Sequence, residues 1–84
     1  MEYVFCSKTR MKILKILHQV GQLNVSEIAK RVGANYVKTK EHLMVLEEEN
    51  IVQHRMYGRT QLYKFNRESM KSQAVHKLIE AWIH

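Results

Sequence analysis

The spacing of apolar residues changes at Asn50 of this 84-residue chain. Before Asn50 apolar residues recur every three or four positions, which is typical of amphipathic helices. After it the period becomes two, over the runs IVQHRMY and TQLYKF, which are rich in β-branched and aromatic residues and are separated by Gly58-Arg59. The pattern therefore predicts helices followed by a β-hairpin with a two-residue turn, because Gly58 can adopt the positive φ of such a turn.

Two helices are expected in the first 33 residues. The first begins after Ser7, a candidate N-cap, and ends at Gly21. Residues 22–25, QLNV, are too short for a helix and are predicted to form an extended, strand-like connector. Ser26 is predicted to cap the second helix, which ends at Gly33.

A third helix is predicted from Asn35, its N-cap, to about Glu49, and the hairpin follows it directly. A fourth helix, capped by Asn66 or Ser69, runs to the end of the chain. The order is helix, short strand, helix, turn, helix, hairpin, helix. This order predicts a mainly α domain with a small β-hairpin, and no composition shift or linker divides the chain.

The charge balance is basic. Lys and Arg total 14 against 8 acidic residues, which gives a formal charge of +6. Such an excess on a small domain attracts polyanions. No apolar stretch is long enough to span a bilayer and Met1–Cys6 does not resemble a signal peptide, so a soluble cytoplasmic protein is expected. Cys6 is interpreted either as a buried apolar residue or as a thiol near a dimer axis.

Two helices joined by a short turn containing Gly, with basic residues on the second, are the elements of a helix-turn-helix. The following stretch, KEHLMVLEEENIVQHRMYGRTQLYKF at 40–65, resembles the winged helix-turn-helix regulators of the ArsR and MarR type. The small size is also similar to that of dimeric winged-helix proteins from archaea and their viruses. The residues that carry the resemblance are His42, Leu43, Leu46, Glu47, Gly58, Arg59 and Tyr63.

The resemblance implies one winged-helix domain at 1–84, with a DNA-binding core at 7–66 and a C-terminal helix at 67–84. Its expected function is sequence-specific regulation of transcription on double-stranded DNA, with the helix at 35–49 in the major groove and the wing tip at 58–59 on the flanking backbone or minor groove. Tyr36 is interpreted either as a DNA contact or as a core residue. The candidate DNA-binding residues are Lys30, Arg31, Asn35, Tyr36, Val37, Lys38, Lys40, Glu41, Arg55 and Arg59.

The C-terminal helix is predicted to pair two copies of the chain. Its apolar stripe, which contains Val75, Leu78, Ile79 and Trp82, is wider than one small core can cover. A homodimer would set two recognition helices about 34 Å apart on a palindromic operator. The alternative is that the helix folds back on its own domain, with Trp82 covering the N-terminal helix.

No pair of acids, activated nucleophile or phosphate-binding glycine loop indicates an enzyme, and no cofactor is expected. His76, Glu80 and His84 share one helix face, but exposed polar residues explain that spacing better than a metal site does. Two other functions remain as alternatives: a winged-helix protein–protein adaptor, and a non-specific coat on nucleic acid or chromatin.

Overall fold

Local capping bonds explain where the helices of this protein begin and end. The computed structural model describes residues 7–83, so Cys6 and His84 lie outside the described residues. The elements are α2 (Lys8–Val20), β1 (Gln22–Asn24), α3 (Val25–Val32), α4 (Tyr36–Glu48), β2 (Val52–Tyr57), β3 (Thr60–Phe65) and α5 (Met70–Ile83).

The predicted start of α2 is confirmed and that of α3 is wrong. The hydroxyl of Ser7 accepts a hydrogen bond from the backbone N–H of Arg10 at 3.2 Å. For α3 the cap is Asn24, whose side-chain oxygen accepts from the N–H of Glu27 at 2.8 Å. Ser26, the predicted cap, already lies inside the helix. Asn24 and Glu27 have the spacing of a capping box, which explains the earlier start.

The other two helices begin as the sequence indicates. The side-chain oxygen of Asn35 accepts from the N–H of Lys38 at 2.8 Å and so caps α4. The hydroxyl of Ser69 accepts from the N–H of Ser72 at 3.2 Å. Ser69 is therefore the cap of α5. The side chain of Asn66, the other candidate, accepts instead from the N–H of Glu68.

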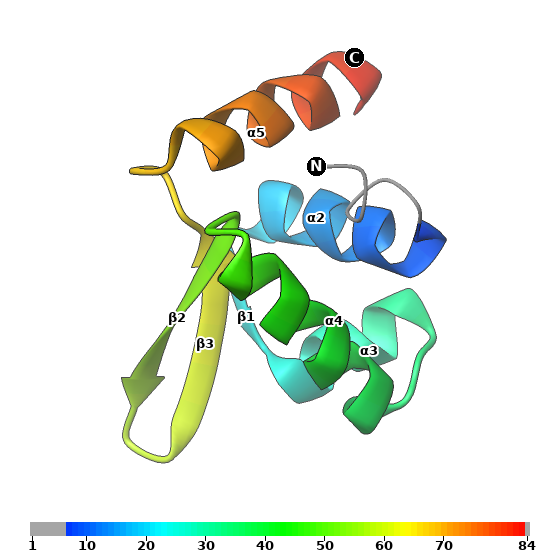
Figure 1. Cartoon of the computed structure of the whole chain (residues 1–84). Coiled ribbons are helices and arrows are strands. Elements are labelled where there is room, and N and C mark those ends of the chain that lie inside the picture. The colour runs from blue at the N-terminus through cyan, green and yellow to red at the C-terminus, as the bar shows by residue number, and fades with distance from the viewer. Residues whose placement is uncertain (1–6, 84) are drawn as a thin grey trace.

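The hairpin has the predicted register and belongs to a larger sheet. Val52 pairs with Phe65, and Gly58 has a φ of +63° in the connecting turn. The predicted strand-like connector adds a third strand, because Leu23 in β1 pairs with Tyr63 in β3. The sheet is antiparallel, in the order β1-β3-β2. Figure 1 shows β2 and β3 extending past the helices as a wing.

One apolar core joins the four helices that the structure describes to the root of the sheet. In Figure 1, α5 lies above α2, and α3 and α4 lie below α2. None of the described helices is long and apolar enough to cross a membrane. The core residues are Ile13, Leu14, Leu17, Val25, Ile28, Val32, Leu43, Leu46, Ile51, Val52, Tyr63, Phe65, Val75 and Ile79.

One backbone carbonyl group connects the root of the wing to α5. The carbonyl oxygen of Ile51, just before β2, accepts from the hydroxyl of Ser72 at 2.7 Å and from the N–H of Asn66 at 2.9 Å. Ser72 is a buried residue of α5, and Asn66 directly follows β3. This carbonyl therefore joins the start of β2 to the end of β3 and to α5.

Candidate nucleic-acid interface

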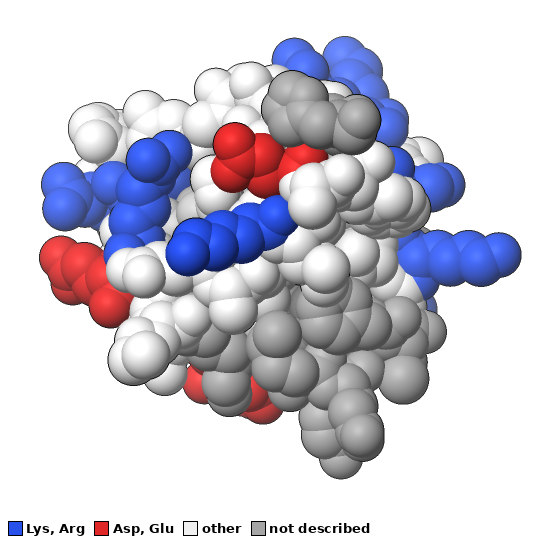
Figure 2. Space-filling view, turned by 90° about the horizontal axis from the view of Figure 1, so that it is seen from above, with Lys and Arg blue, Asp and Glu red and all other residues white. Residues whose placement is uncertain are grey.

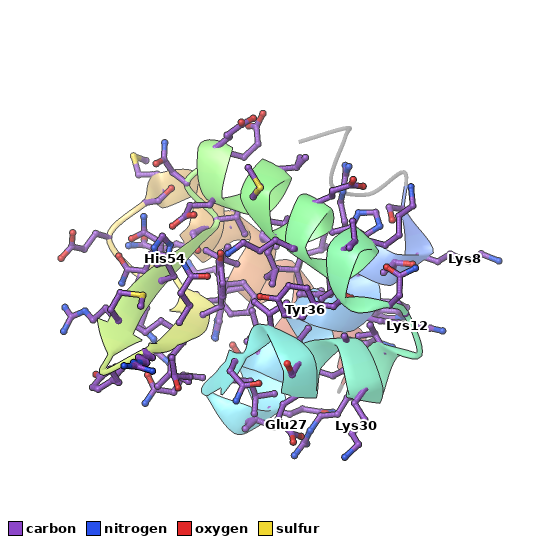
Figure 3. The ribbon with its side chains drawn as sticks, turned by 90° about the horizontal axis from the view of Figure 1, so that it is seen from below. Lys8, Lys12, Glu27, Lys30, Tyr36 and His54 are labelled. Carbon is purple, nitrogen blue, oxygen red and sulfur yellow. The ribbon has the colours of Figure 1, made fainter. Side chains whose placement is uncertain are left out.

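A hollow of about 350 Å³ lies between the tip of the wing and the N-terminal ends of α3 and α4. Figure 3 looks at the molecule from this side and shows Tyr36 between α3 and the wing. A concave surface bounded by a helix end and a hairpin fits the ridge of a nucleic-acid backbone. The lining residues are Asn24, Val25, Ser26, Tyr36, Met56, Arg59, Thr60 and Gln61.

The first turn of α4 is exposed beside this hollow. The exposed fractions are 52% for Tyr36 and 64% for Val37. Helical spacing puts Tyr36 on one face of α4 with Thr39, but of these two only Thr39 is buried. The interpretation of Tyr36 as a core residue is therefore wrong, because its side chain lies at the surface and lines the hollow.

Two opposite charges lie next to each other on the exposed face of α4. The ammonium nitrogen of Lys38 lies 3.7 Å from a carboxylate oxygen of Glu41, and both side chains are mostly exposed. An exposed pair of this kind contributes little to stability. Lys38 and Glu41 are therefore available to a ligand at low cost. Asn35, another candidate, uses its side-chain oxygen to cap the helix.

Lys40 contacts the wing. Its ammonium group donates to the side-chain oxygen of Gln61 and, at 3.1 Å, to the hydroxyl of Tyr63. Both partners belong to β3, so Lys40 connects α4 to the wing rather than extending from the exposed face of α4. These bonds give the ammonium group of Lys40 two partners on the wing, and its role as a DNA contact stays a prediction.

A second polar bond fixes the wing against the other end of α4. A carboxylate oxygen of Glu47 lies 2.6 Å from Nδ1 of His54 in β2, and both side chains are about two-thirds buried. Together with the contacts of Lys40, this bond sets the angle between the wing and α4. A fixed angle matters because both elements must meet one ligand at the same time.

The remaining basic candidates fall into three places. Arg59 is exposed at the wing tip and lines the hollow. Lys30 and Arg31 are exposed on α3, where Arg31 lies 3.8 Å from Glu27, and Figure 3 shows Lys30 at the outer edge of that helix. Arg55 lies in the middle of β2 and lines a different hollow, on the opposite face of the sheet.

The sequence matches a family model described as "Bacterial regulatory protein, arsR family" over residues 7–54, which is more than half of the chain. The chain belongs to the ArsR family. This is a family of DNA-binding transcriptional regulators. A comparison with curated proteins found no match.

Solved structures of ArsR-type proteins have the same fold. HlyU from Vibrio cholerae has a TM-score of 0.79 at 22% identity, over 95% of this chain and 84% of that chain. A homodimeric winged helix-turn-helix DNA-binding domain from Mycobacterium bovis has a TM-score of 0.81 at 24% identity, over 98% and 73%. The transcriptional repressor PagR of Bacillus anthracis has a TM-score of 0.75 at 21% identity, over 92% and 85%.

In this ArsR-family chain the predicted interface stripe of α5 divides into two pairs. Val75 and Ile79 are fully buried in the core of their own domain. Leu78 and Trp82 are 50% and 57% exposed. Of the four predicted interface residues, only Leu78 and Trp82 are therefore available to a partner. A side chain that is buried in its own core cannot also contact the surface of a second copy.

Leu78 and Trp82 border an apolar groove between α5 and the first turns of α2, which Met11 and Ala81 complete. The ammonium group of Lys15 in α2 lies 3.7 Å from the centre of the indole ring. Trp82 thus contacts the N-terminal helix and still exposes more than half of its surface. Figure 2 views the molecule from the α5 side, where most of the described surface is uncharged.

Histidines pair across this fold without forming a metal site among the described residues. Nδ1 of His18 in α2 lies 3.0 Å from Nε2 of His76 in α5, and Glu80 lies 3.8 Å from the other nitrogen of His76. Burial, and then the neighbouring His18, lower the pKa of His76 below 6.5, against the opposing charge of Glu80. Burial, and then Arg10, likewise lower the pKa of His42.

Sequence reasoning missed part of the hollow although the signals were present. Counting from the Gly58-Arg59 turn pairs Met56 with Gln61, which places both side chains on the inner face of the wing. The capping-box spacing of Asn24 and Glu27 would have started α3 at Val25. The approach of α3 to the wing tip is a tertiary fact that neither signal contains.

Proposed function

We propose that two copies of this chain bind a palindromic site on double-stranded DNA and regulate transcription in a sequence-specific manner. The observation that carries this proposal is the exposed first turn of α4 beside Arg59, on one hollow. A helix end and a hairpin tip on the same surface match the geometry by which winged helices enter a groove and contact its margin.

Four residues of α4 are proposed to read base edges. The ring of Tyr36 and the methyl groups of Val37 can contact a thymine methyl, and the ammonium group of Lys38 can donate to guanine. The carboxylate of Glu41 can accept from the amino group of cytosine. In DNA the exposed Lys38–Glu41 pair would open or turn as a unit toward a G·C pair, because its two charges complement the two bases.

Arg59 is proposed to contact phosphate. It lies at the tip of a ribbon whose angle to α4 is fixed by Lys40 and by the Glu47–His54 bond. Lys40 therefore acts on DNA indirectly. Lys30 and Arg31, exposed on α3, are proposed to contact the backbone on the other side of the recognition helix.

The decisive experiment is selection of bound duplexes from a random pool, followed by titrations of the selected site at several salt concentrations. Arg59→Ala should lower affinity similarly on all sequences and reduce the salt slope by about one unit. Lys38→Ala should cost about 1–3 kcal/mol at particular base pairs. Lys8→Ala removes the same charge from α2, on the side of Figure 3 away from the wing, and serves as the control.

Three results would contradict the proposal. If no sequence is enriched and random duplex competes fully, the chain coats nucleic acid without reading it. If no duplex binds at all, an adaptor function becomes the better interpretation. If Lys8→Ala weakens binding as much as Arg59→Ala does, the wing tip has no special position in the complex.

A further inference from the structure

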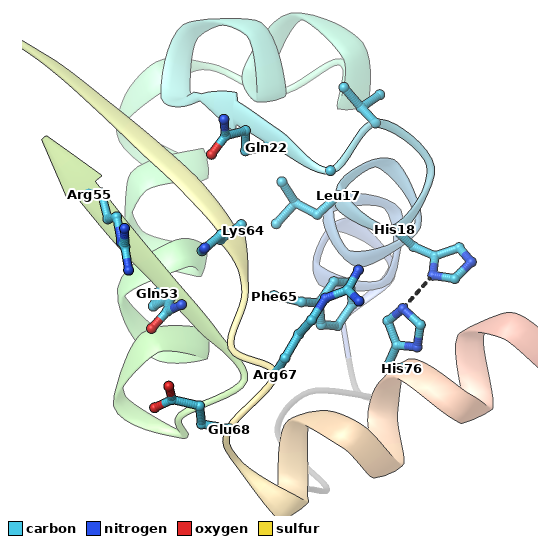
Figure 4. A pocket seen from close by; sticks show the side chains of 12 residues that line it. Leu17, His18, Gln22, Gln53, Arg55, Lys64, Phe65, Arg67, Glu68 and His76 are labelled. Carbon is cyan, nitrogen blue, oxygen red and sulfur yellow. Dashed lines mark hydrogen bonds between the residues drawn. The ribbon is translucent and has the colours of Figure 1, made fainter. Parts of the chain in front are cut away.

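A second hollow, of about 520 Å³, lies at the root of the wing on the face of the sheet that points away from α4. Tyr63 and Phe65 are turned inward, so alternation along β3 turns Lys64 outward. The register pairs Lys64 with Gln22 on one side and with Gln53 on the other. The side chains of Gln22, Lys64 and Gln53 therefore lie in one row across the three strands, with the ammonium group between the two amides. Figure 4 shows these side chains around the hollow.

The hollow has apolar walls as well as this polar row. Leu17 and Phe65, both buried, form part of its lining, and Val20 adds an exposed apolar side chain from the end of α2. His18 and His76 close one end through their mutual contact at 3.0 Å, which Figure 4 marks. Ligand sites typically combine apolar walls with a few convergent polar groups at a volume of about 300–1,000 Å³.

The charges around the hollow are mostly of one sign. Arg55 of β2, Lys64 of β3 and Arg67 of the following connector line it together with a single carboxylate, that of Glu68. None of the three cations forms an ion pair with a side chain that the structure describes. A concave surface with unpaired cations and low-dielectric walls concentrates anions.

The position of this hollow separates it from the proposed DNA surface. The DNA-facing hollow involves the inner face of the wing near its tip, through Met56 and Gln61. The second hollow involves the outer face, through Gln53 and Arg55, and is closed by the last turn of α2 and the start of α5. A duplex seated on α4 and Arg59 would leave it open to a small molecule.

We propose that this hollow binds a small organic anion: a carboxylate or phosphate group carried on an apolar, preferably planar, body. The anionic group would accept hydrogen bonds from Lys64, Arg67 and Arg55. The apolar body would lie against the exposed Val20 and the half-buried rings of His18 and His76. Such a ligand would touch the wing, α2 and α5 at once. The proposal depends on the hollow alone and is independent of DNA binding.

The test uses the full-length protein without DNA and follows backbone amide signals by NMR during titration with 2-naphthoate. Shifts are expected at Gln22, Gln53 and Lys64. The neutral analogue 2-naphthamide should bind about tenfold more weakly, because it lacks the charge that the cations recognise. The double variant K64Q/R67Q should lose about tenfold in affinity for 2-naphthoate, and K30Q, which removes an exposed cation from α3, should lose none.

The same spectra show whether each variant is folded, so a loss of binding can be assigned to the site. Equal affinity for acid and amide would overturn the proposal, as would unchanged affinity in folded K64Q/R67Q or no shifts up to millimolar ligand. Inorganic phosphate binding as tightly as 2-naphthoate would remove the apolar part of the proposed ligand. Displacement of 2-naphthoate by the selected duplex would assign the cations to DNA.

Discussion

At the scale of single residues, one side-chain oxygen decides where α3 begins. Asn24 caps the helix, whereas the hydroxyl of Ser26, two positions later, is exposed and makes no described capping bond. Asn24→Ala should therefore lower the free energy of unfolding by about 1 kcal/mol. Ser26→Ala is the matched control and should change it by less than about 0.5 kcal/mol. Urea denaturation of both variants measures the difference, and equal losses would contradict the assignment of the cap.

The sequence could not place two side chains of α4, because neighbours from other elements decide where they lie. Helical spacing groups Tyr36 with Thr39, yet Thr39 is buried and Tyr36 is exposed at the first turn of α4. Helical spacing places Lys40 on the flank of α4, and the register of β3 brings Gln61 and Tyr63 to its ammonium group. Such contacts depend on the packing angle between helix and hairpin, which has no local signal.

At the scale of elements, periodicity and capping residues were sufficient for most of the fold. The change of period at Asn50 located the wing, and the Gly58-Arg59 turn gave its register. The connector at residues 22–25 could be called extended but not paired. Its pairing with β3 joins segments about forty residues apart, and three residues carry too little pattern to predict that partner.

The bond between α5 and the wing root can be tested by one substitution. Ser72→Ala removes the hydroxyl that donates to the carbonyl of Ile51, which then keeps only the N–H of Asn66 as a donor. We expect a loss of about 0.5–1.5 kcal/mol in the free energy of unfolding. Gln73→Ala is the control, because its exposed amide bonds only to the carbonyl of Arg67 at the surface. A Ser72→Ala variant as stable as the control would contradict the role of this bond.

At the scale of the whole molecule, the exposed groove between α5 and α2 is where a second copy is expected to bind. Leu78→Ala combined with Trp82→Ala removes its two largest exposed apolar side chains. Analytical ultracentrifugation at micromolar concentration should show a dimer for the unmodified chain and a monomer for this variant. Met70→Ala is the control: Met70 is 86% exposed on the same helix but does not line the groove.

A dimer that survives the double substitution would place the interface elsewhere on the molecule. A monomeric unmodified chain that binds a half-site with full affinity would remove the dimer from the proposed function. Operator affinity of the Met70→Ala variant should equal that of the unmodified chain, so a loss in this control would indicate a general effect of surface changes on α5.

Acid should destabilise the whole fold through two histidines. The pKa values of His42 and His76 are lowered in the folded chain, mainly by burial, so the unfolded chain binds more protons near pH 6.5. Stability is then fully present above pH 6.5 and decreases as the pH falls toward the folded pKa values. Thermal melts at pH 7.5 and 5.5 measure this, and the H42Q/H76Q variant should lose part of the difference. An unchanged difference in that variant would contradict the assignment.

Two hydrogen bonds to the carbonyl oxygen of Ile51 connect the base of the wing to α5 and to the end of β3. The hydroxyl of Ser72 donates one of these bonds from α5, and the backbone N–H of Asn66, directly after β3, donates the other. The helix expected to join two copies is therefore hydrogen-bonded to the base of the hairpin whose tip carries Arg59, so the pairing of the copies and the position of Arg59 share one connection.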